Sequence, residues 1–126
     1  MAHVLIVDDV PDSVDPLKVF LEQSGHKIVV AANGQEALVE VIKAAPDAVV
    51  LDLLMPEMDG PSFIEVARSY LRLQSLPIIV LTALTEGPFI DRARAMHVSA
   101  ILVKGKATLE EIKAAIEASL HTLPPA

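Results

Sequence analysis

Cysteine is absent from this chain of 126 residues, so neither a disulfide framework nor a thiolate metal site can form. Aromatic residues make up only 3% of the sequence, and tryptophan does not occur. A core built from Val, Leu, Ile and Ala instead is typical of parallel strands that are covered on both faces. The composition therefore favours an α/β protein held together by apolar packing.

Basic residues are the minority charge, with ten Lys and Arg against seventeen Asp and Glu, for a net charge of −7. Phosphate contacts need clustered Lys and Arg, which this sequence lacks, so we expect no direct nucleic-acid binding. The apolar run near the N-terminus, Val4–Val7, is too short for a signal peptide or a membrane span. We expect a cytoplasmic protein that does not contact membranes.

The length suits one domain over residues 1–126, and whether the chain is part of a larger protein is left open. Five short β-branched runs predict strands: Val4–Val7, Lys27–Ala32, Ala48–Leu51, Pro77–Leu81 and Ala100–Val103. Apolar residues at helical spacing lie between these runs and after the last of them. The alternation predicts a doubly wound, five-stranded parallel sheet with helices on both faces.

Four of the five predicted strands end in polar or charged residues: Asp8 and Asp9 after the first, Asp52 after the third, Thr82 after the fourth and Lys104 after the fifth. The second strand ends in Ala31-Ala32-Asn33, which offers little chemistry. Open α/β sheets bind ligands beyond the carboxyl ends of their strands, where the strand order reverses. An order of 2-1-3-4-5 places the second strand at an edge, away from such a site.

Three carboxylates at one sheet edge need a counter-charge, because two of them about 5 Å apart repel by roughly 3 kcal/mol at an effective dielectric near 20. Oxygen ligands without Cys or a strand-end His favour a hard cation such as Mg²⁺. Lys104 and the Thr82 hydroxyl would then be donors to an oxyanion. This set of groups indicates phosphoryl transfer to a carboxylate.

The order "DD", "D..MPEMDG", "T" and "K" at the strand ends resembles the receiver domain of two-component response regulators, from Val4 to about Leu120. The resemblance implies a flavodoxin-like fold with Asp52 as the phosphoacceptor. Thr82 and Lys104 would be the other catalytic side chains. The resemblance also implies four ligands for Mg²⁺: Asp8, Asp9, Asp52 and the backbone carbonyl of Leu54.

In such a protein, a histidine kinase or a histidine phosphotransfer protein would donate the phosphoryl group to Asp52. A conformational change would then signal to a downstream protein target, which the sequence does not identify. We expect no enzymatic activity apart from self-phosphorylation from a phosphodonor and self-dephosphorylation. Weak homodimerisation is compatible with the family pattern.

Two residues depart from that pattern. Gly105 follows Lys104, where most receivers have a proline after a cis bond, so we predict a trans peptide and a rearranged loop. Ile101 stands where many receivers carry Tyr or Phe, so activation would be transmitted by backbone movement around residues 82–86 and by the fourth helix. Leu54 and Leu84 are apolar at positions that bear on water access, which predicts slow self-dephosphorylation.

Three other functions compete with this interpretation. A degenerate receiver would act as an interaction module without phosphorylation, which Gly105 and Ile101 favour and the intact acids oppose. A hydrolase of the haloacid dehalogenase type needs a second acid where this chain has Leu54, and a capping insertion for which there is no room. A flavin-binding module would need a Ser, Thr or Gly loop in place of the acidic "DDVPDSVD".

Several other residues have a structural interpretation. We expect Asp59 and Gly60 to form a turn and a helix start, and Met55 and Met58 to pack around that turn. The basic residues Arg92, Arg94 and Lys106 are candidates for a partner surface, although such charges are more often only solvated.

Overall fold

The computed structural model describes residues 2–120, and its strands form one parallel sheet in the order β2-β1-β3-β4-β5. The strands are β1 (His3–Val7), β2 (Lys27–Ala31), β3 (Ala48–Leu51), β4 (Ile78–Thr82) and β5 (Ala100–Val103). The predicted doubly wound sheet and its strand order are therefore confirmed. The predicted fourth strand is shifted by one residue, because Thr82 still pairs with Val103.

In the part of the chain that the structure describes, five α-helices and one short 3₁₀ helix connect or follow the strands. They are α1 (Pro11–Gln23), α2 (Gly34–Lys43), α3 (Gly60–Arg68), η1 (Leu71–Leu73), α4 (Pro88–Ala95) and α5 (Leu109–Leu120). Within residues 2–120, no helix has the length and apolar character needed to cross a bilayer.

Side-chain caps define where several helices begin. Before α5, the Glu111 N–H donates to Thr108 Oγ1 and the Thr108 N–H donates to Glu111 Oε1, which is a complete capping box. Before α2, the Glu36 N–H donates to Asn33 Oδ1, and the Glu36 carboxylate accepts from the backbone N–H of Ala32 and the side-chain amide of Asn33. Side chains therefore cap the starts of both α2 and α5.

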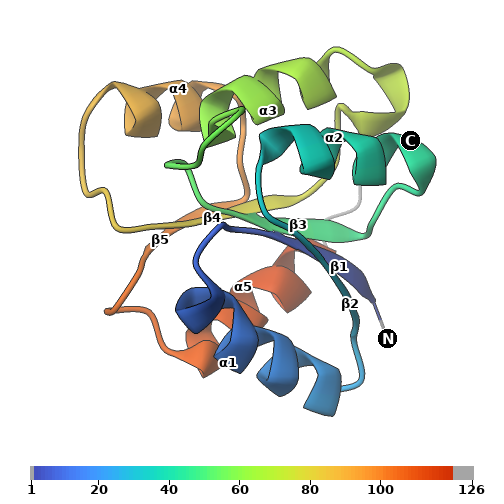
Figure 1. Ribbon diagram of the computed structural model, residues 1–126, viewed down its shortest axis with the longest axis vertical. Coiled ribbons are helices and arrows are strands. Elements are labelled where there is room, and N and C mark those ends of the chain that lie inside the picture. The colour runs from blue at the N-terminus through green and yellow to red at the C-terminus, as the bar shows by residue number, and fades with distance from the viewer. Residues whose placement is uncertain (1, 121–126) are drawn as a thin grey trace.

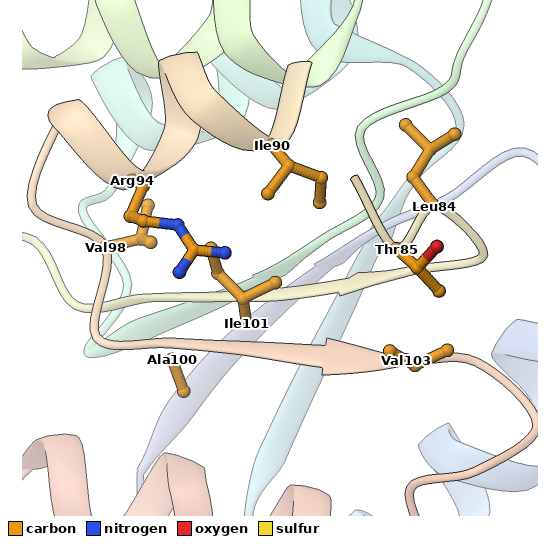
Figure 2. Close-up of a pocket in the computed structure, with 8 residues that line it drawn as sticks. All are labelled: Leu84, Thr85, Ile90, Arg94, Val98, Ala100, Ile101 and Val103. Carbon is orange, nitrogen blue, oxygen red and sulfur yellow. The ribbon is translucent and has the colours of Figure 1, made fainter. Parts of the chain in front are cut away.

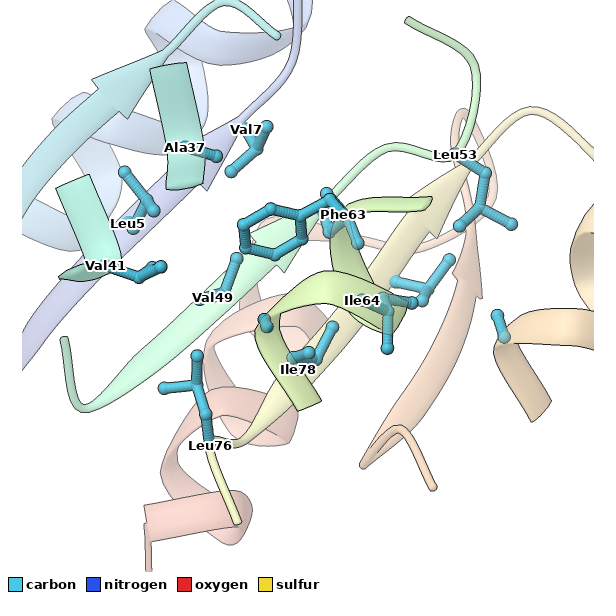
Figure 3. Packing of buried hydrophobic residues seen from close by; sticks show 14 of the residues in the cluster. Leu5, Val7, Ala37, Val41, Val49, Leu53, Phe63, Ile64, Leu76 and Ile78 are labelled. Atoms are coloured by element: carbon cyan, nitrogen blue, oxygen red, sulfur yellow. The ribbon is translucent and has the colours of Figure 1, made fainter. Parts of the chain in front are cut away.

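Two apolar layers hold the helices on opposite faces of the sheet (Figure 1). Helices α2, α3 and α4 cover one face, where the fully buried Phe63 packs among residues of β1, β3 and β4 (Figure 3). Helices α1 and α5 cover the other face. Successive residues of β1 alternate between the layers, as expected for a strand buried on both sides, and the sheet is held rigidly between them.

The Arg68 side chain ties the end of α3 to two later loops. Its guanidinium donates to the carbonyls of Leu73 (3.0 Å), Leu76 (2.8 Å), Met96 (3.4 Å) and His97 (3.4 Å). Burial lowers the pKa of this guanidinium below its ordinary value. The carbonyls satisfy its donors, so Arg68 fixes the C-terminal end of α4 against α3.

Candidate functional site

The backbone hydrogen bonds between neighbouring strands continue for one residue past the strand ends. The carboxyl ends of these strands therefore lie side by side. The Asp8 N–H donates to the Ala31 carbonyl (3.1 Å), and the Asp52 N–H donates to the Val7 carbonyl (3.0 Å). The Lys104 N–H donates to the Thr82 carbonyl (2.9 Å). Asp8, Asp52, Thr82 and Lys104 are therefore held by backbone bonds of the sheet, whereas Asp9 lies in the bend that follows β1.

Three carboxylates meet at this edge of the sheet. Asp8, Asp9 and Asp52 each place one oxygen so that the three atoms lie within 4.8 Å of one another. Asp8 and Asp52 are buried, with 7% and 6% of their surface exposed, whereas Asp9 is exposed to solvent. Oδ1 of Asp8 accepts the Val10 N–H at 2.9 Å, which orients this carboxylate at the start of α1.

Lys104 supplies the cation that the two buried acids require. Its Nζ lies 2.7 Å from Asp8 Oδ2 and 2.9 Å from Asp52 Oδ2, and only 18% of the lysine side chain is exposed. Burial favours the neutral amine, but hydrogen bonds and charge attraction from Asp52 and Asp8 outweigh it and raise the pKa of Lys104 above its ordinary value. The lysine is therefore charged at neutral pH and offsets much of the repulsion between the acids.

Thr82 and Leu54 complete the predicted set at the ends of β4 and β3. Thr82 is fully buried, and its Oγ1 accepts the Leu84 N–H at 3.3 Å. The Leu54 N–H donates to Asp52 Oδ1 at 3.3 Å, while 48% of the Leu54 surface is exposed. The two oxygens of Asp52 thus have different partners, a backbone N–H and an ammonium.

Two glycines fix the loop that follows Asp52, and this role was not foreseen. A Cβ atom on Gly60 would lie 2.6 Å from Leu53 Cα and 2.7 Å from the Asp52 carbonyl oxygen. A Cβ on Gly34 would lie 2.5 Å from the Met58 carbonyl oxygen, which accepts the Gly34 N–H. The sequence carries no local signal for the contact of Gly34 with Met58, because it joins segments that are distant along the chain.

The same loop contains a tight turn centred on Glu57. The Met58 N–H donates to the Pro56 carbonyl at 2.8 Å, and Glu57 has a φ of 68°, as in a strained three-residue turn. Asp59 then caps α3 by accepting the Ser62 N–H at 2.8 Å, as expected from the turn and helix-start interpretation. Met58 packs against the core, which agrees with its predicted structural role.

The peptide after Lys104 is trans, because no cis bond occurs in residues 2–120. Gly105 has a φ of 82°, and the Lys106 N–H donates to the Val103 carbonyl at 3.2 Å. This left-handed glycine turn follows β5 directly, and Lys104 still reaches both acids from it. The predicted trans bond is confirmed, and the turn shows how a glycine serves at this position.

The acidic cluster suits a hard cation. All of its potential metal ligands are carboxylate oxygens. Asp9 forms no hydrogen bond or salt bridge with other residues of the described chain. Mg²⁺ binds few protein carboxylates and keeps several water ligands. Two buried carboxylates and a third that is open to solvent match this preference. Asp8, Asp9 and Asp52 therefore offer the oxygen ligands that a divalent metal ion requires.

Comparison with protein families gives one match across nearly the whole domain. The model of the response regulator receiver domain matches residues 4–117. Among curated proteins, the response regulator Rre1 of Synechocystis is 41% identical over 81 residues, which are 64% of this chain and 35% of Rre1. The alkaline phosphatase synthesis transcriptional regulatory protein PhoP of Bacillus subtilis is 42% identical over 85 residues, or 66% of this chain and 34% of PhoP.

An uncharacterised 14.6 kDa protein of Leptolyngbya boryana is 42% identical over 80 residues, which are 64% of this chain and 61% of that protein. The chain therefore covers less than two-thirds of the length of these three relatives.

Solved structures show the same architecture over the full length. The signal receiver domain of a histidine kinase from Syntrophus aciditrophicus has a TM-score of 0.87 at 26% identity, covering 100% of this chain and 98% of that one. The chemotaxis protein CheY4 of Vibrio cholerae, crystallised at low pH, has a TM-score of 0.86 at 29% identity, with 94% and 98% coverage.

Proposed function

Because the chain belongs to the response regulator receiver domain family, which acts in two-component signalling, we propose that Asp52 is its phosphoacceptor. One observation carries this proposal. Asp52 is a buried carboxylate at the end of the central strand β3, and the ammonium of Lys104 holds it at 2.9 Å. A carboxylate placed next to a fixed cation and a buried hydroxyl-bearing strand end is suited to accept a phosphoryl group.

The reaction follows from the roles of these side chains. A carboxylate oxygen of Asp52 attacks the phosphorus of a phosphohistidine, and the bond from phosphorus to the imidazole nitrogen breaks. The imidazole leaves with the electron pair and takes up a proton. Lys104 balances the negative charge that the phosphoryl oxygens bring to the site, and the Thr82 hydroxyl donates to one of them.

Asp8, Asp9, Asp52 and the Leu54 backbone carbonyl are the proposed ligands of Mg²⁺. When bound there, the metal would neutralise charge on the phosphoryl oxygens during transfer. The cluster of three carboxylate oxygens within 4.8 Å supports this assignment. Asp8 also binds Lys104, so it would hold the lysine and the metal in one charge network.

The proposed partners follow from the relatives and from the charge of the chain. A histidine kinase or a histidine phosphotransfer protein would be the donor, and a downstream protein would receive the signal. The acidic composition supports a protein target instead of DNA, and cytoplasmic location is the corresponding expectation. We propose that residues 1–126 act as one domain, whose signal passes through residues 82–106.

Intact-mass measurement tests the phosphoacceptor directly. The purified protein is incubated with acetyl phosphate or phosphoramidate and Mg²⁺, beside Asp52→Asn as the matched control. The wild type should gain one phosphoryl group, and Asp52→Asn should gain none. A folded wild type that gains none would contradict the proposal and favour an interaction module that works without phosphorylation. Continuous turnover of small phosphomonoesters would favour a hydrolase instead.

A further inference from the structure

A pocket of about 400 Å³ lies between α4 and β5, apart from the acidic cluster (Figure 2). Ile90 and Arg94 descend into it from α4, and Ile101 and Val103 line it from β5. Its volume falls within the range of sites that bind small molecules. Among the residues used for the proposed phosphorylation, none lines this pocket.

The pocket lies where the edge strand β5 faces the short helix α4. Ile101 packs against the layer under α2, α3 and α4, whereas its neighbours Ala100 and Leu102 pack against the opposite layer. β5 has no further strand beyond it, and α4 ends at Ala95. Ile101 therefore forms part of an apolar floor beneath this short helix.

Arg94 gives this apolar space a positive charge. It is exposed and is the only charged residue in the lining, and Figure 2 shows its guanidinium extended from α4 above Ile101. Within residues 2–120 it forms no salt bridge, whereas Arg92 on the same helix lies 3.5 Å from Glu65. Most Lys and Arg side chains of residues 2–120 likewise form no salt bridge, so it is the place of Arg94 in the pocket lining that sets it apart.

We propose that this pocket binds a small organic carboxylate with a compact apolar body, such as an aryl-substituted carboxylic acid. The carboxylate would pair with Arg94, whose planar guanidinium suits two-point contact with such a group. The apolar body would cover Ile90, Ile101 and Val103 and remove their exposed surface from water. Because Arg94 is the only charge in the lining, a cationic or neutral ligand of the same shape would bind more weakly.

Occupancy of the pocket should also affect the acidic site. Leu84 and Thr85 line the pocket, and they lie two and three residues after Thr82. The Leu84 N–H donates to Thr82 Oγ1 at 3.3 Å, so a ligand that contacts Leu84 acts on the segment that holds this hydroxyl. This coupling rests on the proposed phosphorylation of Asp52, whereas binding of the acid does not.

Binding is tested by amide NMR titration of the unphosphorylated protein with 3-phenylpropionate, beside its neutral amide. Saturable shifts should appear at Leu84, Thr85, Ile101 and Val103, with weaker binding of the amide. Failure of the acid to bind at about 10 mM, the weak limit for a ligand of this size, would overturn the proposal. If an acidic aromatic dipeptide binds and 3-phenylpropionate does not, the proposal that the pocket binds a small organic carboxylate would be wrong.

Three variants separate the causes of binding. Arg94→Gln should weaken binding of the acid about fivefold, the upper range for an exposed ion pair. Arg92→Gln removes the same charge outside the pocket and should leave the affinity within about twofold. Ile101→Phe places a larger side chain in the pocket without changing charge and should weaken binding strongly. Equal losses in Arg94→Gln and Arg92→Gln would show that net charge, and not the pocket, attracts the acid.

The coupling is tested separately in protein that accepts phosphoryl from acetyl phosphate. Saturating acid should change the rate of phosphoryl uptake in the wild type and leave that of Ile101→Phe unchanged. An unchanged wild-type rate with intact binding would overturn the coupling alone. A protein that binds the acid but takes up no phosphoryl group would contradict the proposed function and not the pocket.

Discussion

Lys104→Met should destabilise the metal-free protein by about 2–3 kcal/mol. The substitution keeps most of the apolar stem but removes the ammonium that lies 2.7 Å from Asp8 and 2.9 Å from Asp52. Two unit charges at 4.8 Å, the outer limit in the acidic cluster, repel by about 3.5 kcal/mol at an effective dielectric of 20. Solvent around the exposed Asp9 reduces this figure.

The loss of stability should be measurable at neutral pH as a lower melting temperature. For a domain of this size, the melting temperature should fall by about 8–12 °C.

Chemical denaturation in EDTA, followed by circular dichroism, measures the change in unfolding free energy. Lys106→Met is the matched control, because Lys106 is an exposed lysine in the same turn and forms no salt bridge within the described chain. It should change stability by less than about 0.5 kcal/mol. Equal stability of the Lys104 and Lys106 variants would refute the reasoning about charge.

Addition of Mg²⁺ provides a second, opposite test of the same reasoning. A cation at the acidic cluster should stabilise Lys104→Met more than the wild type, because the ammonium no longer competes for Asp8 and Asp52. A smaller Mg²⁺ effect in the variant would show that Lys104 assists metal binding instead of competing with it.

Four further predictions concern stability and phosphoryl lifetime. Because the pKa of Lys104 is raised in the folded protein, the stability that this lysine contributes is complete below about pH 10.4 and is lost as the pH rises through the folded pKa. Thermal melts at alkaline pH in which wild type and Lys104→Gln lose stability in parallel would contradict this. Arg68→Met should cost about 2–4 kcal/mol in urea melts, because buried carbonyls lose a charged donor, and full stability would argue against that anchor. Gly60→Ala should lower the free energy of unfolding by about 2–3 kcal/mol and slow phosphoryl uptake. Gly105→Ala should lower it by only about 1–2 kcal/mol, because a Cβ atom there meets open space. A larger loss for Gly105→Ala than for Gly60→Ala would be inconsistent with the backbone contacts. The exposed Leu54 side chain cannot orient water, so Leu54→Asn should speed loss of the phosphoryl group roughly tenfold in a mass-spectrometric time course. An unchanged half-life would show that the side chain at position 54 does not control the attacking water.

Sequence patterns located the sheet and the strand ends because these features depend on local order. The β-branched runs Ala48–Leu51 and Ala100–Val103 match β3 and β5 residue for residue. Once the parallel order was inferred, the positions of Asp52 and Lys104 at one sheet edge followed from chain direction alone. The acidic cluster was therefore accessible to reasoning from the sequence.

Contacts between segments that are distant in the chain were not accessible in this way. Arg68 binds carbonyls on two later loops, and no local pattern indicates that these loops approach α3. Gly34 meets Met58 through the packing of α2 beside the loop after β3, which only the assembled fold determines. The pocket beside Ile101 likewise depends on the length and placement of α4.

Location of the phosphoryl group on the chain tests the central claim most directly. Freshly phosphorylated protein is treated with hydroxylamine, which converts an aspartyl phosphate into a hydroxamate, and the peptides are then sequenced by mass spectrometry. Our account predicts a hydroxamate at Asp52 and at neither Asp8 nor Asp9. A hydroxamate at either of those two acids, or none in a folded protein exposed to phosphodonor and Mg²⁺, would contradict it.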